Sequence, residues 1–72
     1  MKKRGENMEV SGRKLSIAMA EACMTVKELS KKAGITDQTL QNVLRERKKP
    51  SFATIGKIAH ALGVPVTDII KD

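Results

Sequence analysis

The sequence predicts an all-α domain, a compact five-helix bundle, on three observations. Signals for the start of a helix recur four times along the chain, and glycines stand where two of these helices would end. Between the signals, apolar residues recur at intervals of three and four, the spacing of a helix with one buried face. The alternation of apolar and polar residues that is typical of strands is absent from the sequence.

Each start signal is a serine or threonine that follows an apolar residue and precedes another by four positions. The hydroxyl of such a residue accepts a hydrogen bond from an N–H of the first turn, and the two apolar side chains pack together. Thr25 also has Glu28 three residues later, which completes a capping box. The residues in this position are Ser11, Thr25, Thr36 and Ser51.

The end signals divide the chain into helices within one domain, residues 10–72. Gly34 and Gly63 stand where a left-handed residue ends a helix, Pro50 ends a basic loop, and Pro65 can open a last short helix. Residues 1–9 are predicted to form a flexible basic arm. The predicted helices span residues 11–22, 26–33, 37–46, 52–62 and 66–70.

The apolar faces of these helices predict one shared core. On the third helix Leu40, Val43 and Leu44 would face inward, so that its polar residues would face outward or sideways. The predicted core comprises Leu15, Ala18, Ala22, Leu29, Ala33, Leu40, Val43, Leu44, Phe52, Ile55, Ile58, Ala59 and Leu62.

Length and charge indicate a small domain with an anionic partner. The 72 residues suffice for one domain and carry a net charge of +6. Residues 1–14 hold five basic and two acidic residues and residues 35–49 hold four and two, whereas residues 50–72 balance at two and two. This distribution favours a polyanion, although a merely solvated surface would carry the same charges. Phe52 is the single aromatic residue, which favours duplex DNA because single-stranded nucleic acid is usually bound by stacking on aromatic rings.

The sequence shows no catalytic or metal-binding constellation. His60 is the single histidine, and Cys23 has no second cysteine or nearby histidine as a partner. We therefore predict no enzyme activity, no cofactor, no metal and no small-molecule ligand. There is no apolar run long enough for a membrane span, and no apolar segment follows the basic N-terminus as in a secretory signal. The lone cysteine fits a reducing cytoplasm, where DNA binding would associate the protein with the nucleoid.

A set of spaced motifs extends these inferences. They run from Met24-Thr25 through Leu29-Ser30, Ala33-Gly34-Ile35-Thr36 and Thr39-Leu40 to Pro50-Ser51, Ile58-Ala59, Ala61-Leu62-Gly63-Val64 and Asp68-Ile69-Ile70. With them the sequence, over residues 15–70, resembles the lambda-repressor-like, Cro/C1-type (Xre-type) helix-turn-helix family. The resemblance implies a five-helix domain whose third helix enters the major groove of DNA. It also implies a prokaryotic transcription regulator of a kind that often binds as a dimer.

The resemblance assigns base contacts to Gln38, Thr39 and Asn42. A glutamine or asparagine can pair with adenine through two atoms, and a threonine can exchange a hydrogen bond or touch a thymine methyl. Asp37 is a further candidate, which could accept from a cytosine amino group or favour the positive end of its own helix; we prefer the second interpretation. Phosphate contacts are assigned to helix starts and to the cations around the loop. These residues are Thr25, Val26, Thr36, Gln41, Arg45, Arg47, Lys48, Lys49 and Ser51.

Three positions depart from the family pattern. Val26 stands where the family usually has glutamine, Glu46 where it often has glycine, and Cys23 where a glycine or small polar residue is common. The first departure removes a side-chain contact to DNA. The second predicts that the third helix runs on or that its loop differs.

The leading functional hypothesis is a sequence-specific double-stranded DNA-binding transcription regulator, a repressor, that contacts the major groove with its third helix. The alternative is a protein-interaction module, such as the antitoxin of a toxin–antitoxin pair. The alternative rests on the apolar segment 64–70, which exceeds what one short helix needs for its own packing. A homodimer explains the segment more simply, with a predicted interface formed by Val66, Ile69 and Ile70.

Overall fold

The computed structural model describes residues 9–71, so that most of the predicted N-terminal arm, residues 1–8, lies outside it. Within this part of the chain there are four α-helices and one short 3₁₀ turn. The all-α prediction is confirmed, whereas the expected fifth helix is reduced to a 3₁₀ turn of three residues. The elements are α1 (Gly12–Glu21), α2 (Val26–Ala33), α3 (Asp37–Leu44), α4 (Phe52–Leu62) and η1 (Val66–Asp68).

The four predicted helix starts are confirmed as N-caps. The side chains of Ser11, Thr25, Thr36 and Ser51 each accept a hydrogen bond from the backbone N–H three residues later. At Thr25 both hydrogen bonds of the capping box form, because Glu28 also accepts from the Thr25 N–H at 2.9 Å. The sequence signals therefore place the first residue of each α-helix.

The helix ends agree less closely with the prediction. Gly34 and Gly63 adopt the expected left-handed conformation, with φ of 77° and 74°. However, Cys23 and Glu46 are also left-handed, with φ of 56° and 55°, although neither is a glycine. The turn at Glu46 ends α3 at Leu44, two residues before its predicted end at 46.

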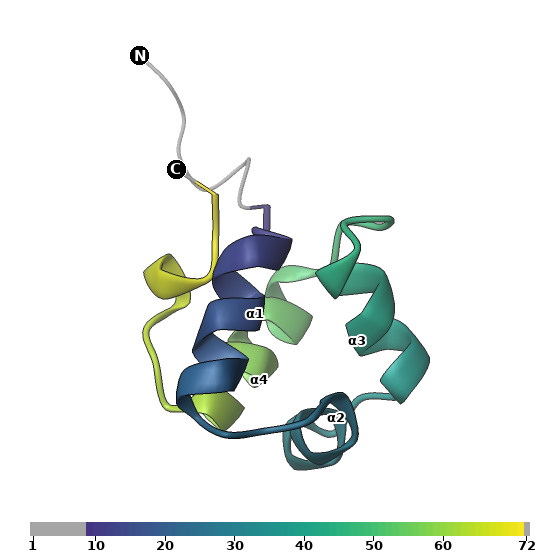
Figure 1. Ribbon diagram of the computed structural model, residues 1–72. Coiled ribbons are helices and arrows are strands. Elements are labelled where there is room, and N and C mark those ends of the chain that lie inside the picture. The colour runs from purple at the N-terminus through teal and green to yellow at the C-terminus, as the bar shows by residue number, and fades with distance from the viewer. Residues whose placement is uncertain (1–8, 72) are drawn as a thin grey trace.

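In the view of Figure 1, α1 lies in front of α4, with α2 and α3 to one side of α1 and η1 to the other. The helix α2 contacts both α3 and α4, whereas η1 contacts α1 and α4. The loop between α3 and α4 projects from the same side as α3. No helix among residues 9–71 has the length and apolar character required to cross a membrane.

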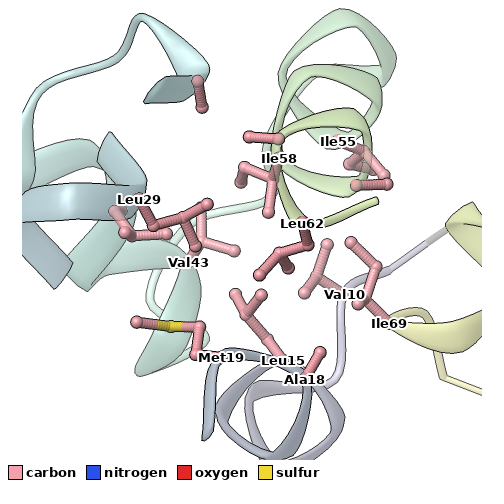
Figure 2. Close-up of a cluster of buried hydrophobic side chains, with 14 residues drawn as sticks. Val10, Leu15, Ala18, Met19, Leu29, Val43, Ile55, Ile58, Leu62 and Ile69 are labelled. Atoms are coloured by element: carbon pink, nitrogen blue, oxygen red, sulfur yellow. The ribbon is translucent and has the colours of Figure 1, made fainter. Parts of the chain in front are cut away.

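The core lies between α1, α4 and the helix pair α2–α3 (Figure 2). Most of the predicted core residues are buried, with Ala22 and Leu44 packed at its margin. Phe52 is the exception: it was predicted to line the core but is 58% exposed, because it is the first residue of α4 and lies outside the packed face. Conversely, Met19 and Ile69 belong to the core with exposures of only 7% and 0%.

The two ends of the described chain run side by side. Val10 and Ile70 form an isolated antiparallel bridge, and the Lys71 N–H donates to the Glu9 carbonyl at 2.7 Å. The Ser11 N–H donates to the Ile69 carbonyl at 2.8 Å. Glu9, which is expected in the arm, is thus part of the folded domain, and the short pairing between residues 9–11 and 69–71 joins the two ends of this domain.

Candidate nucleic-acid interface

The helices α2 and α3 form a helix-turn-helix around Gly34. The left-handed Gly34 reverses the chain, and the Ile35 N–H donates to the Ser30 carbonyl at 2.9 Å, which satisfies a carbonyl at the end of α2. Ile35 is half-buried against the core, and Thr36 then caps α3. The sequence therefore fixes both the end of the first helix and the start of the second.

The inner side of α3 is apolar and its outer side is polar. Leu40 and Val43 are buried, which turns Gln38 and Asn42 away from the core. The Gln38 Nε2 donates to the Asn42 Oδ1 at 3.2 Å, so that two carboxamides lie one turn apart on the same outer face. Carboxamides carry donors and acceptors that match the edge of adenine in the major groove. Thr39 is half-buried beside them, and its hydroxyl oxygen lies 2.8 Å from that of Thr36.

Asp37 has a partner within the protein. Its carboxylate accepts a hydrogen bond from the hydroxyl of Ser30, a side chain that is only 1% exposed. Because Asp37 is the first residue of α3, its charge also lies at the positive end of that helix. This geometry favours the preferred interpretation, in which Asp37 stabilises α3, over a base contact. The hydrogen bond also joins the two helices of the helix-turn-helix.

The predicted phosphate-contacting residues at helix starts differ in exposure. Thr25, Thr36 and Ser51 are exposed N-caps at the positive ends of α2, α3 and α4. Val26 instead packs its side chain against the core, so only its backbone N–H is suited to a phosphate contact. Gln41 lies half-buried on the flank of α3.

The four predicted cations follow α3 closely. Arg45, Arg47, Lys48 and Lys49 are all exposed, and the Arg47 N–H donates to the Asn42 carbonyl at 2.9 Å, which folds the start of the loop back onto α3. Lys49 lies 3.3 Å from a carboxylate oxygen of Glu9. An exposed ion pair of this kind is weak and can exchange for a phosphate.

Sequence reasoning missed the group that holds the end of α3. The Glu46 carboxylate accepts from the Gly12 N–H at 2.8 Å and lies 2.7 Å from the Lys71 Nζ. The hydrogen bond from Lys71, followed by that from Gly12, lowers the pKa of Glu46, and the same contact raises the pKa of Lys71. The one sign of this role in the sequence is that glutamate stands at position 46 where the family often has glycine. No local pattern indicates that its partners are residues 12 and 71.

The predicted dimer interface is only partly on the surface. Ile69 is fully buried within the chain, so its side chain is not available to a second copy. Its burial corrects the sequence argument that segment 64–70 exceeds the needs of its own packing. Val66 and Ile70 are half-buried and pack against the same core.

The chain belongs to the family of Cro/C1-type helix-turn-helix DNA-binding domains, whose model matches residues 14–72. The family is thus a DNA-binding class, and the helix-turn-helix described above is the part of the chain that defines it. No match is found among curated proteins.

Solved structures of transcription regulators share the fold. The clp gene regulator ClgR from Corynebacterium glutamicum is 30% identical, with a TM-score of 0.73 over 79% of this chain and 74% of that one. SinR, a master regulator of biofilm formation known from Bacillus subtilis, is 26% identical in a complex with DNA. Its TM-score is 0.74, over 79% of this chain and 95% of that one.

The fold also occurs as a small part of an enzyme. A hydroxyethylphosphonate dioxygenase matches with a TM-score of 0.78 at 23% identity, over 90% of this chain but only 14% of that one. At this identity the match shows the fold alone, and it involves a minor portion of the enzyme.

Proposed function

We propose that this protein is a sequence-specific double-stranded DNA-binding transcription regulator, a repressor, that inserts α3 into the major groove. The observation that carries the proposal is the outer face of α3, where two carboxamides stand one turn apart beside an exposed basic loop. A helix of this kind fits the groove, and its side chains reach the base edges. Repression requires only that the bound site overlaps a promoter.

Base recognition falls to Gln38, Asn42 and Thr39. In the free protein the Gln38 amide donates to the Asn42 oxygen, so adenine contacts that use these two atoms would replace this hydrogen bond. Thr39 can contribute a hydroxyl or a methyl contact. Asp37 contributes indirectly, because its bond to Ser30 sets the start of α3.

Phosphate binding falls to the exposed helix starts and the loop. N–H groups at the beginnings of α2 and α4, near Thr25 and Ser51, lie at positive helix ends that favour an anion. Thr36, Gln41 and the cations Arg45, Arg47, Lys48 and Lys49 would add contacts that position the protein without selecting sequence.

We further propose that the protein acts as a homodimer on a palindromic site. Two copies related by a two-fold axis would present their α3 helices to half-sites about one helical turn, or roughly 34 Å, apart. Val66 and Ile70 remain candidates for the contact between copies, whereas Ile69 supports them from within the core. Size-exclusion chromatography with light scattering would test this, and a monomer at the concentration where DNA is bound would contradict it.

The alternative role as an antitoxin or adaptor loses its main sequence argument. That argument required an excess of apolar surface in segment 64–70, and the burial of Ile69 accounts for much of that apolar character. A toxin that co-purifies with the chain would restore this alternative.

The proposed function is tested by selection from a randomised duplex library at two salt concentrations. We expect enrichment of a palindrome with spaced half-sites at both concentrations, and weaker binding to all sequences at the higher one. Salt-sensitive binding without an enriched motif would contradict sequence-specific recognition and leave only a basic surface.

A further inference from the structure

The carboxylate of Glu46 joins three separate parts of the chain. It follows the C-terminal end of α3, and its Oε2 accepts from the N–H of Gly12 at the start of α1. Its Oε1 lies 2.7 Å from the Nζ of Lys71 in the C-terminal segment. Both oxygens are therefore engaged by groups that are distant in sequence. The Gly12 N–H belongs to the first turn of α1, whose N–H groups lack partners within the helix, so Glu46 also acts as a cap of α1.

The backbone of Glu46 is held in a conformation that glutamate normally avoids. Its φ is 55°, in the left-handed region, where a side chain crowds the following carbonyl and glycine is favoured. The chain reverses at this residue, and the basic loop starts directly after it. The direction of Arg47, Lys48 and Lys49 therefore depends on the turn that Glu46 makes.

The backbone of Gly12 also lies close to the end of α3. A Cβ added to Gly12 would lie 2.2 Å from the carbonyl oxygen of Leu44, the last residue of α3. The start of α1 thus packs backbone to backbone against the end of α3. With no side chain between them, a shift of either helix would move the other.

The contacts of the Glu46 carboxylate with Gly12 and Lys71 form an anchor for the end of α3. Lys71 connects this anchor to the paired chain ends. Its N–H donates to the Glu9 carbonyl at 2.7 Å, and its Nζ also lies 3.7 Å from the Glu9 carboxylate. The charged residues that line the pocket beside these contacts are Glu9, Glu46, Arg47, Lys48, Lys49 and Lys71. Most of the charged residues that line this pocket beside Glu46 are cations, and Glu9 is the single other anion in the lining.

We propose that Glu46 is a positioning residue for DNA binding, which holds the C-terminal end of α3 and the basic loop against α1 and Lys71. The inference rests on the proposed function and deepens it. Its consequence is that Lys71 and Gly12 control DNA affinity although neither is among the residues proposed to contact DNA. The closure of the chain ends is thereby coupled to the geometry of the recognition helix.

Simple electrostatics predicts the opposite sign for the loss of Glu46. Removing a carboxylate next to a basic loop reduces repulsion from phosphates and should strengthen binding to every duplex. The positioning role predicts weaker binding instead. The sign of the change therefore separates the two interpretations.

The test measures affinity of the full chain for its selected duplex in four variants. Glu46→Gln keeps an oxygen for the Gly12 N–H but loses the ion pair, and Lys71→Gln removes the same pair from the other side. We expect each to weaken binding about fivefold or more, which corresponds to an ordinary coupling between contacting residues. The controls are Glu21→Gln and Lys57→Gln, which remove the same charges from exposed positions of α1 and α4 and should change binding far less.

A double variant and a glycine variant make the test independent of simple destabilisation. Glu46→Gln combined with Lys71→Gln should bind no more weakly than either single variant, because both remove one contact. Glu46→Gly relieves the left-handed backbone, which offsets the stability lost with the contacts of Glu46, so this variant should remain folded and yet bind weakly. Binding by Glu46→Gln or Glu46→Gly that is equal to or tighter than that of the unchanged chain would overturn the proposal, as would losses that multiply in the double variant.

A spectroscopic measurement reports the anchor without DNA. The amide proton resonance of Gly12 should move as Glu46 ionises, and it should stop moving in Glu46→Gln. A Gly12 resonance that does not shift with pH in the unchanged chain would contradict the hydrogen bond between Gly12 and Glu46. An unchanged chain that binds no duplex would overturn the proposed function and this inference together, whereas normal binding with an unaffected Glu46→Gln would overturn only this inference.

Discussion

The two ends of α3 are held by different kinds of contact. At the N-terminal end, the buried hydroxyl of Ser30 donates to Asp37, so the anchor lies within the helix-turn-helix itself. At the C-terminal end, Glu46 reaches Gly12 and Lys71, which come from opposite ends of the folded chain. The first anchor forms between neighbours in sequence and the second only when the whole domain is closed. Helix α3 therefore depends on local contacts for its start and on contacts between distant parts of the chain for its end.

The largest effect is expected where α1 meets the end of α3. Gly12→Ala would place a Cβ 2.2 Å from the Leu44 carbonyl oxygen, and the backbone on both sides would have to move. We expect a loss of roughly 3 kcal/mol or more in the free energy of unfolding, at the upper end of overpacking costs. The matched control is Gly56→Ala in α4, where a Cβ meets nothing within 4 Å. It should stabilise the protein by about 0.5–1 kcal/mol, because alanine favours a helix. Denaturant unfolding of both variants measures the difference, and a mild effect at Gly12 would mean that the helices do not pack this closely.

The outer face of α3 and the basic loop after it should also differ in what they contribute to DNA binding. Gln38→Ala and Asn42→Ala should each cost about 1–3 kcal/mol on the selected duplex and relax the preference at one base pair. Lys48→Ala, beyond the C-terminal end, should weaken binding to all duplexes alike and reduce the salt dependence. Competition assays with single-base variants of the site distinguish the two. Equal losses on every sequence from all three variants would count against base recognition by α3.

The contact between Ser30 and Asp37 should contribute to the free energy of unfolding about as much as one ordinary hydrogen bond. Ser30→Ala should destabilise the protein by roughly 1 kcal/mol, since it leaves the Asp37 carboxylate without this donor. Ser16→Ala, at an exposed position of α1, serves as the control and should change stability by only a few tenths of a kcal/mol. Additive effects of Ser30→Ala and Asp37→Ala in a double-mutant cycle would show that the two side chains do not interact.

A comparison of the two non-glycine residues with a left-handed backbone distinguishes the cost of backbone strain from the contribution of side-chain contacts. Cys23 and Glu46 have nearly the same φ, but the Cys23 thiol is exposed whereas Glu46 binds Gly12 and Lys71. Cys23→Gly should therefore stabilise the protein by about 1 kcal/mol through relief of the backbone. Glu46→Gly should gain less, or lose stability, because the same relief is offset by the lost contacts. Equal gains at both positions, measured by thermal unfolding, would show that the Glu46 contacts contribute nothing.

The smallest effect is the pH dependence of the Glu46–Lys71 pair. The pKa of Glu46 is lowered from 4.5, so its contribution to stability is present above that value and is lost as the pH falls through the lower pKa of the folded state. The pKa of Lys71 is raised from 10.5, so its contribution is complete below that value and is lost as the pH rises beyond it. The groups are exposed to solvent and salt, which keeps the effect small. Glu46→Gln should flatten the acid limb of the stability profile below about pH 4.5, and an unchanged acid limb would contradict the pKa shift.

The sequence predicted the features of this fold that local chemistry determines. The hydroxyls of Thr25 and Thr36 and the glycine at 34 specify where α2 and α3 begin and where the turn lies, because each acts within one helical turn. The outward orientation of Gln38 and Asn42 followed from the inward spacing of Leu40 and Val43 in the same way.

Two of the features that the sequence did not predict depend on contacts between distant residues. Glu46 ends α3 early with the help of Gly12, which lies 34 residues away. Ile69 turns into the core instead of extending a fifth helix, because segment 69–71 pairs with residues 9–11. Phe52 was assigned to the core by its apolar character alone, although as the first residue of α4 it lies outside the packed face.

The central claim is that the polar face of α3 and its flanking helix starts form the DNA-binding surface. The most direct test is a nuclear magnetic resonance titration of the isotope-labelled protein with its selected duplex, followed residue by residue. We expect the largest shifts at the amides of Thr25, residues 38–42, the basic loop and Ser51, with little change at Glu21 and Thr67 on the α1–η1 side. Shifts concentrated on the α1–η1 side, with residues 38–42 unaffected, would contradict it.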